Sequence, residues 1–246
     1  VIEMACCAGL PLAEGRLDPL GASTYGVGEL MLAAAKDGVK HIILGLGGSA
    51  TNDCGCGAAA ATGIRFLNKA GQAFVPTGGT LHDIAKRDTA GLDEFLHNIK
   101  ITAMCDIDNP MYGEHGAAHV FAPQKGADER AVKLLDEGVR NFNEVLKSDL
   151  HIDASELPGG GAAGAMGAGV YALWGASLQM GIDTVLDIVD FDKKLNNVDY
   201  VFTGEGRIDS QSLRGKVVIG VARRAKEKGV PVIAVVGSIG YGIDQA

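Results

Sequence analysis

The chain has 246 residues, with 22 Lys and Arg against 30 Asp and Glu, which gives a formal net charge of −8 at pH 7. Hydrophobic residues make up 47% and charged residues 21% of the chain, a range that is typical of folded globular proteins and excludes a disordered chain. The acidic balance provides no broad electrostatic attraction for nucleic acid or anionic membranes, so the expected partner is a small molecule.

Glycine and cysteine usage narrow the class of protein further. The chain holds 36 glycines, well above the usual share of about 7%, and many lie in short loops after apolar runs, where the backbone can approach a ligand closely. The five cysteines are odd in number and form no C-x-x-C pair, which excludes a disulfide framework and a zinc motif. We interpret them as the reduced thiols of a cytoplasmic protein.

Helical patterns and continuous apolar runs alternate along the chain, and the runs are of the kind found in strands covered on both faces. In chain order, the patterns predict a helix over 28–36, strands over 40–46 and 99–105, a helix over 128–147, a strand over 200–203, a helix over 216–228 and a strand over 231–236. In the longest helix the apolar residues share one face: Val132, Leu135, Val139, Phe142 and Leu146. This order predicts an α/β fold with right-handed crossovers.

Three further segments interrupt this alternation. Residues 74–96 have few long apolar runs and read as an irregular connection or a short two-stranded piece. Residues 157–182 carry no charge, but their glycines and alanines predict a buried loop leading into an Ala-rich helix rather than a membrane span. The polar segment 190–197 is a candidate domain boundary.

The two ends of the chain read as interrupted elements. Residues 1–4 resemble the middle of a strand without an initiator Met, and residues 237–240 resemble a strand-to-helix turn cut short. We therefore expect the chain to be an internal piece of a longer protein.

The first candidate site is the loop 45–53, which follows a predicted strand and precedes a segment of small residues that could form a helix. Free backbone N–H groups at such a junction bind anions. The candidate phosphate ligands are the backbone of Gly47 and Gly48 and the side chains of Ser49, Thr51 and Asn52. Asp53 could bind Mg²⁺ or accept a hydroxyl proton, and the alternative is that Asn52 or Asp53 simply caps a helix.

The same loop partly fits a dinucleotide fingerprint. Gly45, Gly47 and Ala50 match G-x-G-x-x-G/A, but this fingerprint expects an acidic residue about 20 positions later. No Asp or Glu occurs between Asp53 and Asp83, so the match is weak.

Two further candidates follow later strands or turns. Asp106 comes directly after a predicted strand, and together with Asp108 and Asn109 it could bind a Mg²⁺–phosphate unit, although an Asx turn would explain the same residues. Lys125 lies between Pro123 and Gly126 on a short turn and could meet a phosphate, with an exposed loop lysine as the alternative.

The last two candidates are rich in glycine. In 203–211, Arg207 could grip a carboxylate or phosphate, and Asp209 could act as a general base beside Glu205; an internal Arg207–Asp209 or Glu205–Arg207 ion pair is the alternative. Residues 158–169 could cradle a phosphate by backbone N–H groups alone, with close helix packing as an equal alternative.

Taken together, these motifs resemble the bacterial type I glycerate kinase family. The resemblance rests on co-linear motifs that cover essentially the whole chain: IEMACCAGL (2–10), STYGVGEL (23–30), GGSATND (47–53), CDIDNP (105–110), FAPQKGA (121–127), GGGAAGAMGAG (159–169) and TGEGRIDSQS (203–212). It implies phosphorylation of D-glycerate to 2-phosphoglycerate with ATP and Mg²⁺.

The resemblance also implies a domain organisation. It implies two α/β domains with the active-site cleft between them, one of them Rossmann-like and discontinuous, with the second inserted in it. In this numbering, residues 1–22 and 193–246 belong to the Rossmann-like domain and residues 23–192 form the inserted domain. Family members extend further at both ends, which puts the activity of this piece alone in doubt, and a homodimer is one possible assembly.

Residue roles follow by matching positions. We assign Lys125 and Arg207 to phosphate or the glycerate carboxylate, and Asp209 to the base. The metal ligands are Asp53 and Asp106. The remaining substrate or phosphate contacts are Gly47, Gly48, Ser49, Thr51, Asn52 and Glu205. Cys54 and Cys56 replace small residues usual in the family, and their thiols could make the loop sensitive to oxidation.

Two other functions stay open at this point. A dinucleotide-binding oxidoreductase would bind a nicotinamide cofactor without binding ATP. A non-catalytic sugar-acid or nucleotide sensor would bind its ligand without turnover.

Overall fold

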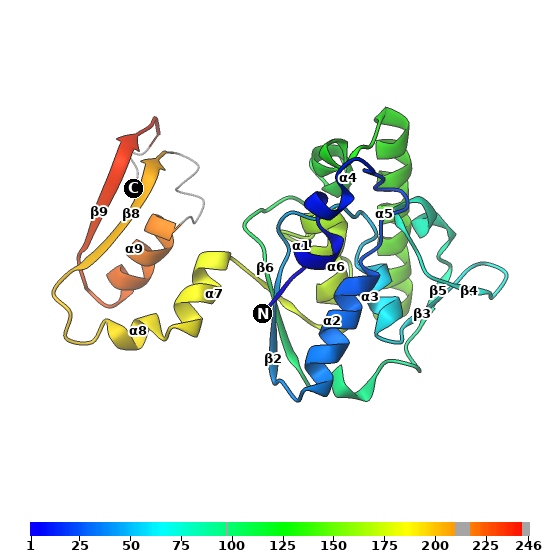
Figure 1. The fold of residues 1–246 in the computed structure, drawn as a ribbon, viewed down its shortest axis with the longest axis horizontal. Coiled ribbons are helices and arrows are strands. Elements are labelled where there is room, and N and C mark those ends of the chain that lie inside the picture. Colours follow the sequence, from blue (N-terminus) through cyan, green and yellow to red (C-terminus); the bar gives the residue numbers. More distant parts are fainter. Residues whose placement is uncertain (97, 210–216, 243–246) are drawn as a thin grey trace. The chain divides into compact units, whose positions relative to one another are not determined.

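The structure, a computed structural model, describes residues 1–96, 98–209 and 217–242. It divides into two compact units, Val1–Leu178 and Gln179–Ala246, which are described separately (Figure 1). The contacts place residues 1–22 with the first unit, whereas the sequence grouped them with 193–246. The predicted inserted-domain arrangement, which concerns a longer protein, stays a prediction.

The first unit contains a four-stranded sheet with helices packed against it. The strand order is β1-β2-β6-β7, and β1, β2 and β6 run parallel. The strands of this sheet are β1 (Ile2–Glu3), β2 (His41–Gly45), β6 (Lys100–Met104) and β7 (Ser177–Gln179). The helices are α1 (Ala5–Ala8), α2 (Tyr25–Lys36), α3 (Cys56–Ala61), α4 (Ala117–Phe121), α5 (Glu129–Leu150) and α6 (Ala162–Trp174). Together they form the α/β architecture that the sequence predicts.

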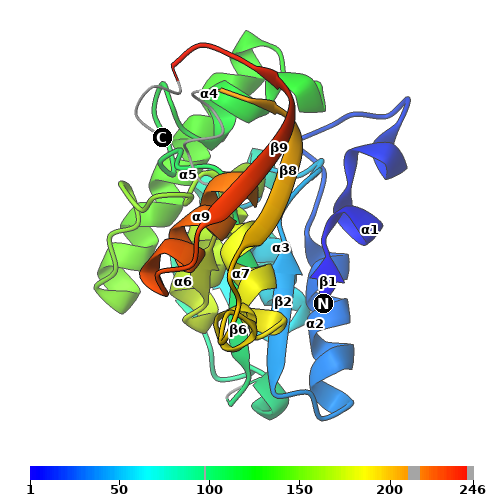
Figure 2. The ribbon, with the colours of Figure 1, turned by 90° about the vertical axis from the view of Figure 1, so that its left-hand side faces the viewer.

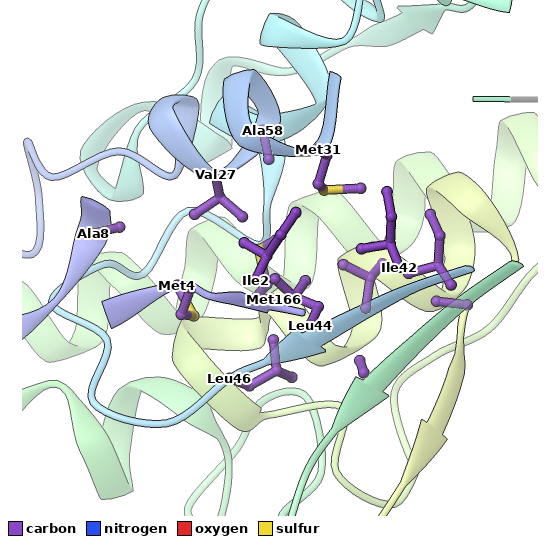
Figure 3. Packing of buried hydrophobic residues seen from close by; sticks show 14 of the residues in the cluster. Ile2, Met4, Ala8, Val27, Met31, Ile42, Leu44, Leu46, Ala58 and Met166 are labelled. Carbon is purple, nitrogen blue, oxygen red and sulfur yellow. The ribbon is translucent and has the colours of Figure 1, made fainter. Parts of the chain in front are cut away.

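Apolar side chains of the sheet and of two helices make one core. Ile42 and Leu44 of β2 are buried in a cluster with Met31 of α2 and Met166 of α6 (Figure 3). The continuous apolar run 40–46 is therefore buried along β2, as expected for a strand covered on both sides.

A second core lies between α5 and a small antiparallel sheet. This sheet has the order β4-β3-β5 and consists of β3 (Arg65–Leu67), β4 (Ala73–Phe74) and β5 (Lys86–Asp88). Phe66 of β3 meets Phe142 of α5 edge to face, with ring centroids 6.3 Å apart. The predicted apolar face of α5 is buried throughout, and Asp128 caps the helix by accepting a hydrogen bond from the Ala131 N–H.

Short 3₁₀ turns complete the first unit. They are η1 (Leu10–Ala13), η2 (Gly78–Asp83), η3 (Glu94–Leu96) and η4 (Pro123–Lys125). Residues 74–96, interpreted from the sequence as irregular or two-stranded, contain two of these turns and the strand β5, which pairs with β3. None of the described helices combines the length and the apolar character that a membrane span requires.

The second unit has two parallel strands connected through a helix. It comprises α7 (Gly181–Ile188), α8 (Phe191–Lys194), β8 (Val201–Ile208), α9 (Val217–Glu227) and β9 (Val232–Ile239). The strands lie side by side along their length (Figure 2). Arg223 of α9 pairs with Asp183 of α7, and Arg224 of α9 pairs with Asp187 and Asp192, so ion pairs tie α9 to the two preceding helices.

Candidate active site

A pocket of about 290 Å³ lies in the first unit, where β2 and β6 end. The carboxyl ends of parallel strands are the usual ligand edge of an α/β sheet. The pocket is lined by Leu10, Leu46, Gly47, Gly48, Ser49, Met104, Cys105, Asp106, Ile107, Phe121, Gln124, Lys125, Ala162 and Ala163. It therefore brings together five of the predicted site residues: Gly47, Gly48, Ser49, Asp106 and Lys125.

The loop after β2 offers backbone donors to this pocket. Gly48 has a φ of +70°, which glycine adopts without a steric penalty. The Gly48 carbonyl accepts a hydrogen bond from the Leu10 N–H, and the Ala50 N–H donates to the Ala8 carbonyl, so the loop is fixed on both sides of Ser49. Within the described residues, no acceptor bonds the N–H groups of Gly47, Gly48 or Ser49. Such clustered free donors form an anion-binding concavity.

The helix predicted after this loop makes a smaller contribution than expected. Helix α3 begins only at Cys56 and has six residues. A helix this short and this far from Ser49 adds little dipole field at the loop, because the dipole effect is confined to the first turn. Anion binding here depends on the loop donors and on a buried cation.

Lys125 supplies that cation from the end of η4. Its side chain is 1% exposed, and its Nζ donates to Ser49 Oγ (2.9 Å) and to the Thr51 carbonyl (2.7 Å). Burial lowers the pKa of Lys125 to about 8, against an opposing contribution from Asp53. In the described part of the chain, no carboxylate lies within 4 Å of this ammonium. The alternative of an exposed loop lysine is therefore wrong, and at neutral pH the pocket wall carries a positive charge without a direct counter-ion.

Asp53 lies behind the loop and not in the pocket wall. Its side chain is 0% exposed, and its Oδ2 accepts hydrogen bonds from the Thr24 N–H (2.8 Å), the Thr24 hydroxyl (2.9 Å) and the Gly57 N–H (3.2 Å). Its Oδ1 accepts from the Gly55 N–H (3.1 Å). Both oxygens are thus engaged by donors and shielded from solvent, which corrects the metal role predicted from the sequence: this geometry is that of an anchor.

Asn52 and Thr51 are also buried and are not among the lining residues. Thr51 contributes its backbone carbonyl to Lys125, while its hydroxyl has no hydrogen-bond partner. Both amide atoms of Asn52 also lack a partner. The phosphate contacts predicted for these two side chains stay predictions, because the pocket is lined by the residues in front of them.

Asp106 lines the pocket directly after β6, beside Cys105. The Cys105 thiol donates to the Ile107 carbonyl at 3.3 Å. Across the described residues, no group of three or more His, Cys, Asp or Glu side chains could hold a metal ion by itself. Mg²⁺ in nucleotide sites is held by one or two carboxylates plus phosphate oxygens, so Asp106 fits as one protein ligand of a phosphate-bound Mg²⁺.

The remaining predicted residues lie on the second unit. Glu205 and Arg207 belong to β8, and Asp209 follows it. Arg207 Nε lies 3.3 Å from Asp209 Oδ2, which is one of the internal ion pairs considered from the sequence, and Glu205 Oε1 is buried without a hydrogen-bond partner. The rest of this motif, residues 210–212, lies outside the described residues.

The glycine-rich segment before α6 adopts an unusual backbone. Ala163, Gly164 and Ala165 have φ values of +54°, +68° and +64°, a left-handed conformation that costs an alanine roughly 1–2 kcal/mol. The Gly164 carbonyl accepts a hydrogen bond from the Cys54 N–H, and Ala163 lines the pocket. The segment therefore packs against the loop and borders the pocket, so both sequence interpretations contain part of the answer.

Cys54 and Cys56 are fully buried, and burial raises the pKa of both thiols well above the usual value. Because the thiolate is the reactive form, the predicted oxidation sensitivity of the loop is not supported by this environment. We expect a small alkylating reagent to modify exposed Cys6 while leaving Cys54 and Cys56 intact in the native protein. Peptide mass spectrometry over a time course, with a denatured control, measures this. Equal native rates for Cys6 and Cys54 would contradict it.

Comparison with known proteins was made against this geometry. The Glycerate kinase family matches residues 1–246. A Glycerate kinase of Bacillus cereus is 50% identical over 239 residues, which cover 97% of this chain and 63% of that protein. The Glycerate 2-kinase of Escherichia coli K12 is 45% identical over 240 residues, which cover 97% and 63%.

A solved structure agrees with these relatives. A crystal structure described as a glycerate kinase 2 from Salmonella typhimurium LT2 matches with a TM-score of 0.87 at 45% identity, over 96% of this chain and 64% of that chain. The chain thus spans slightly less than two thirds of the length of the relatives it matches. With the family matched over its whole length, the chain belongs to the glycerate kinase family.

Proposed function

We propose that the protein phosphorylates D-glycerate to 2-phosphoglycerate with ATP and Mg²⁺. The family membership and the names of the relatives support the kinase and its acceptor. The observation that carries the proposal is the buried ammonium of Lys125 in the wall of a small pocket, beside the free N–H groups of Gly47, Gly48 and Ser49. Both reactants are anions, and these groups are suited to hold a carboxylate or a phosphoryl group.

Phosphoryl transfer asks a protein mainly for positioning and for stabilisation of negative charge. In this proposal, Lys125 and the loop N–H groups hold and orient the anion, while the apolar side chains of the pocket wall limit access of water. Mg²⁺, when bound with ATP, neutralises phosphate charge, and Asp106 is the lining residue that would hold it. The oxygen of Ser49 keeps the Lys125 ammonium at the pocket wall.

The roles of the second unit form part of the same proposal. Asp209 accepts the proton of the reacting hydroxyl, and its ion pair with Arg207 orients the carboxylate. Arg207 itself, together with Glu205, contributes to holding the phosphate or the substrate. A cytoplasmic protein that binds neither nucleic acid nor membranes is consistent with the net charge of −8, and a homodimer is proposed as its assembly.

Phosphorus NMR of the intact protein with Mg-ATP and D-glycerate tests the reaction. Formation of 2-phosphoglycerate is the expected result. Formation of 3-phosphoglycerate would keep the kinase and overturn the position of transfer. A folded protein that binds D-glycerate without any phosphorylated product would favour the sensor alternative, and binding of a nicotinamide cofactor in place of ATP would favour the oxidoreductase.

The D106N variant should lower kcat by about 10²-fold, because it removes the lining carboxylate assigned to the metal–phosphate unit. Asp108 provides a matched control, since it is exposed, lies two residues away and does not line the pocket. D108N should therefore keep near-normal turnover. Equal rates for D106N and D108N would remove Asp106 from the site.

A further inference from the structure

Asp53 and Lys125 are two buried, oppositely charged groups that approach the same loop from different sides. Lys125 Nζ is bonded to Ser49 and to the Thr51 carbonyl, while Asp53 binds the backbone that follows, at Gly55 and Gly57. The two charges lie beyond 4 Å from each other, so they form no direct ion pair. Each is nevertheless without another charged partner in its immediate surroundings within the described residues.

The hydrogen bonds of Asp53 show which protonation state the fold requires. All four partners are donors: the N–H groups of Thr24, Gly55 and Gly57, and the Thr24 hydroxyl. The Thr24 oxygen accepts its own hydrogen bond from the Ala58 N–H, so its proton points to Asp53. A protonated carboxyl would find no acceptor here. Although burial raises the pKa of Asp53, these bonds lower it, and the arrangement fits the ionised form.

An ionised Asp53 then acts on Lys125 through the interior. A charge several ångströms away in a medium of low effective dielectric changes the energy of another buried charge by more than 1 kcal/mol. Asp53 favours the charged form of Lys125, whereas burial disfavours it. The other titratable groups that line the pocket with Lys125 in the described chain are Asp106 and Cys105, both at the end of β6.

We propose that Asp53 is a positioning residue of the anion site: it fixes the loop that holds the Lys125 ammonium and keeps that ammonium charged without contacting the ligand. This inference rests on the proposed function only in taking the pocket to bind an anion. It assigns Asp53 a task that the sequence pattern, which pointed to a metal ligand, did not contain.

The pH dependence of sulfate binding by the intact protein tests the electrostatic part, since sulfate keeps its charge across the range. In the wild type, affinity should fall above about pH 8, where Lys125 loses its proton. In D53N, this fall should begin about one pH unit lower. T24V removes one bond to Asp53 and keeps the charge, and D136N removes another buried carboxylate, which pairs with Arg140. Neither control should move the fall.

A double-variant cycle keeps the inference testable if D53N folds poorly. Without the buried ammonium, the negative charge of Asp53 has nothing to balance, so D53N should be at least tenfold less destabilising in a K125M background, as a ratio of unfolding equilibrium constants. An equal loss in both backgrounds, or an unshifted pH dependence in folded D53N, would overturn the proposal. Because sulfate is the probe, these outcomes are independent of whether D-glycerate is the substrate.

Discussion

The K125M variant should bind D-glycerate and sulfate far more weakly than the wild type and lose about 10³-fold in kcat/KM. Methionine keeps the length of the side chain and removes the charge that faces the bound anion. A charge-assisted contact in a pocket shielded from water is among the strongest single contributions to binding and catalysis. Steady-state kinetics with the phosphorylated product as the readout measures the loss. K133M, an exposed lysine of α5, is the control and should behave like the wild type.

The same variant should not weaken the fold, which separates a functional lysine from a structural one. The pKa of Lys125 falls from 10.5 to about 8 on folding, so the buried charge costs roughly 3 kcal/mol at neutral pH. Between pH 8 and 10.5 the unfolded lysine keeps its proton and the folded one has lost it, so the free energy of unfolding of the wild type should rise with pH relative to K125M. Urea unfolding at pH 7 and pH 10 checks this. A large loss of stability in K125M at pH 7 would contradict it.

The G164A variant should lower the free energy of unfolding by more than about 3 kcal/mol. An added Cβ would collide with the Thr51 carbonyl and the Asn52 Cα, and alanine is disfavoured at the φ of +68°. Gly175 has almost the same φ, +66°, at the end of the same helix, with no atom within 4 Å of an added Cβ. G175A should therefore cost only about 1 kcal/mol.

The difference between these two variants isolates the close contact between α6 and the loop. Both carry the cost of a left-handed alanine, but only G164A forces two backbone segments apart. Urea unfolding of both proteins under one condition measures it. Equal losses would mean that Gly164 serves conformation alone.

Elements with a strong local pattern were predicted well from the sequence. The apolar positions of α5 recur with helical spacing, and all of them are buried as predicted. The runs 40–46 and 99–105 become β2 and β6, and the strand predicted over 200–203 extends to Ile208. Strands of two or three residues, such as β3 and β4, are too short to leave a pattern, which explains why the antiparallel sheet was missed.

The site was harder to predict because its contacts join distant segments. The sequence identified Ser49 and Lys125 as separate candidates, but their hydrogen bond spans 76 residues of the chain. Thr24 was part of a matching motif and gave no sign of its bonds to Asp53. The left-handed backbone at Ala163 and Ala165 opposes the intrinsic preference of alanine, so only tertiary packing explains it.

Calorimetric titration of the wild type and of K125M with D-glycerate, at pH 6.5 and pH 9.5, tests the central claim most directly. The buried ammonium predicts binding by the wild type at pH 6.5, at least tenfold weaker binding at pH 9.5, and no measurable binding by K125M at either pH. Wild-type affinity in a folded K125M protein would contradict the claim that Lys125 holds the anionic substrate.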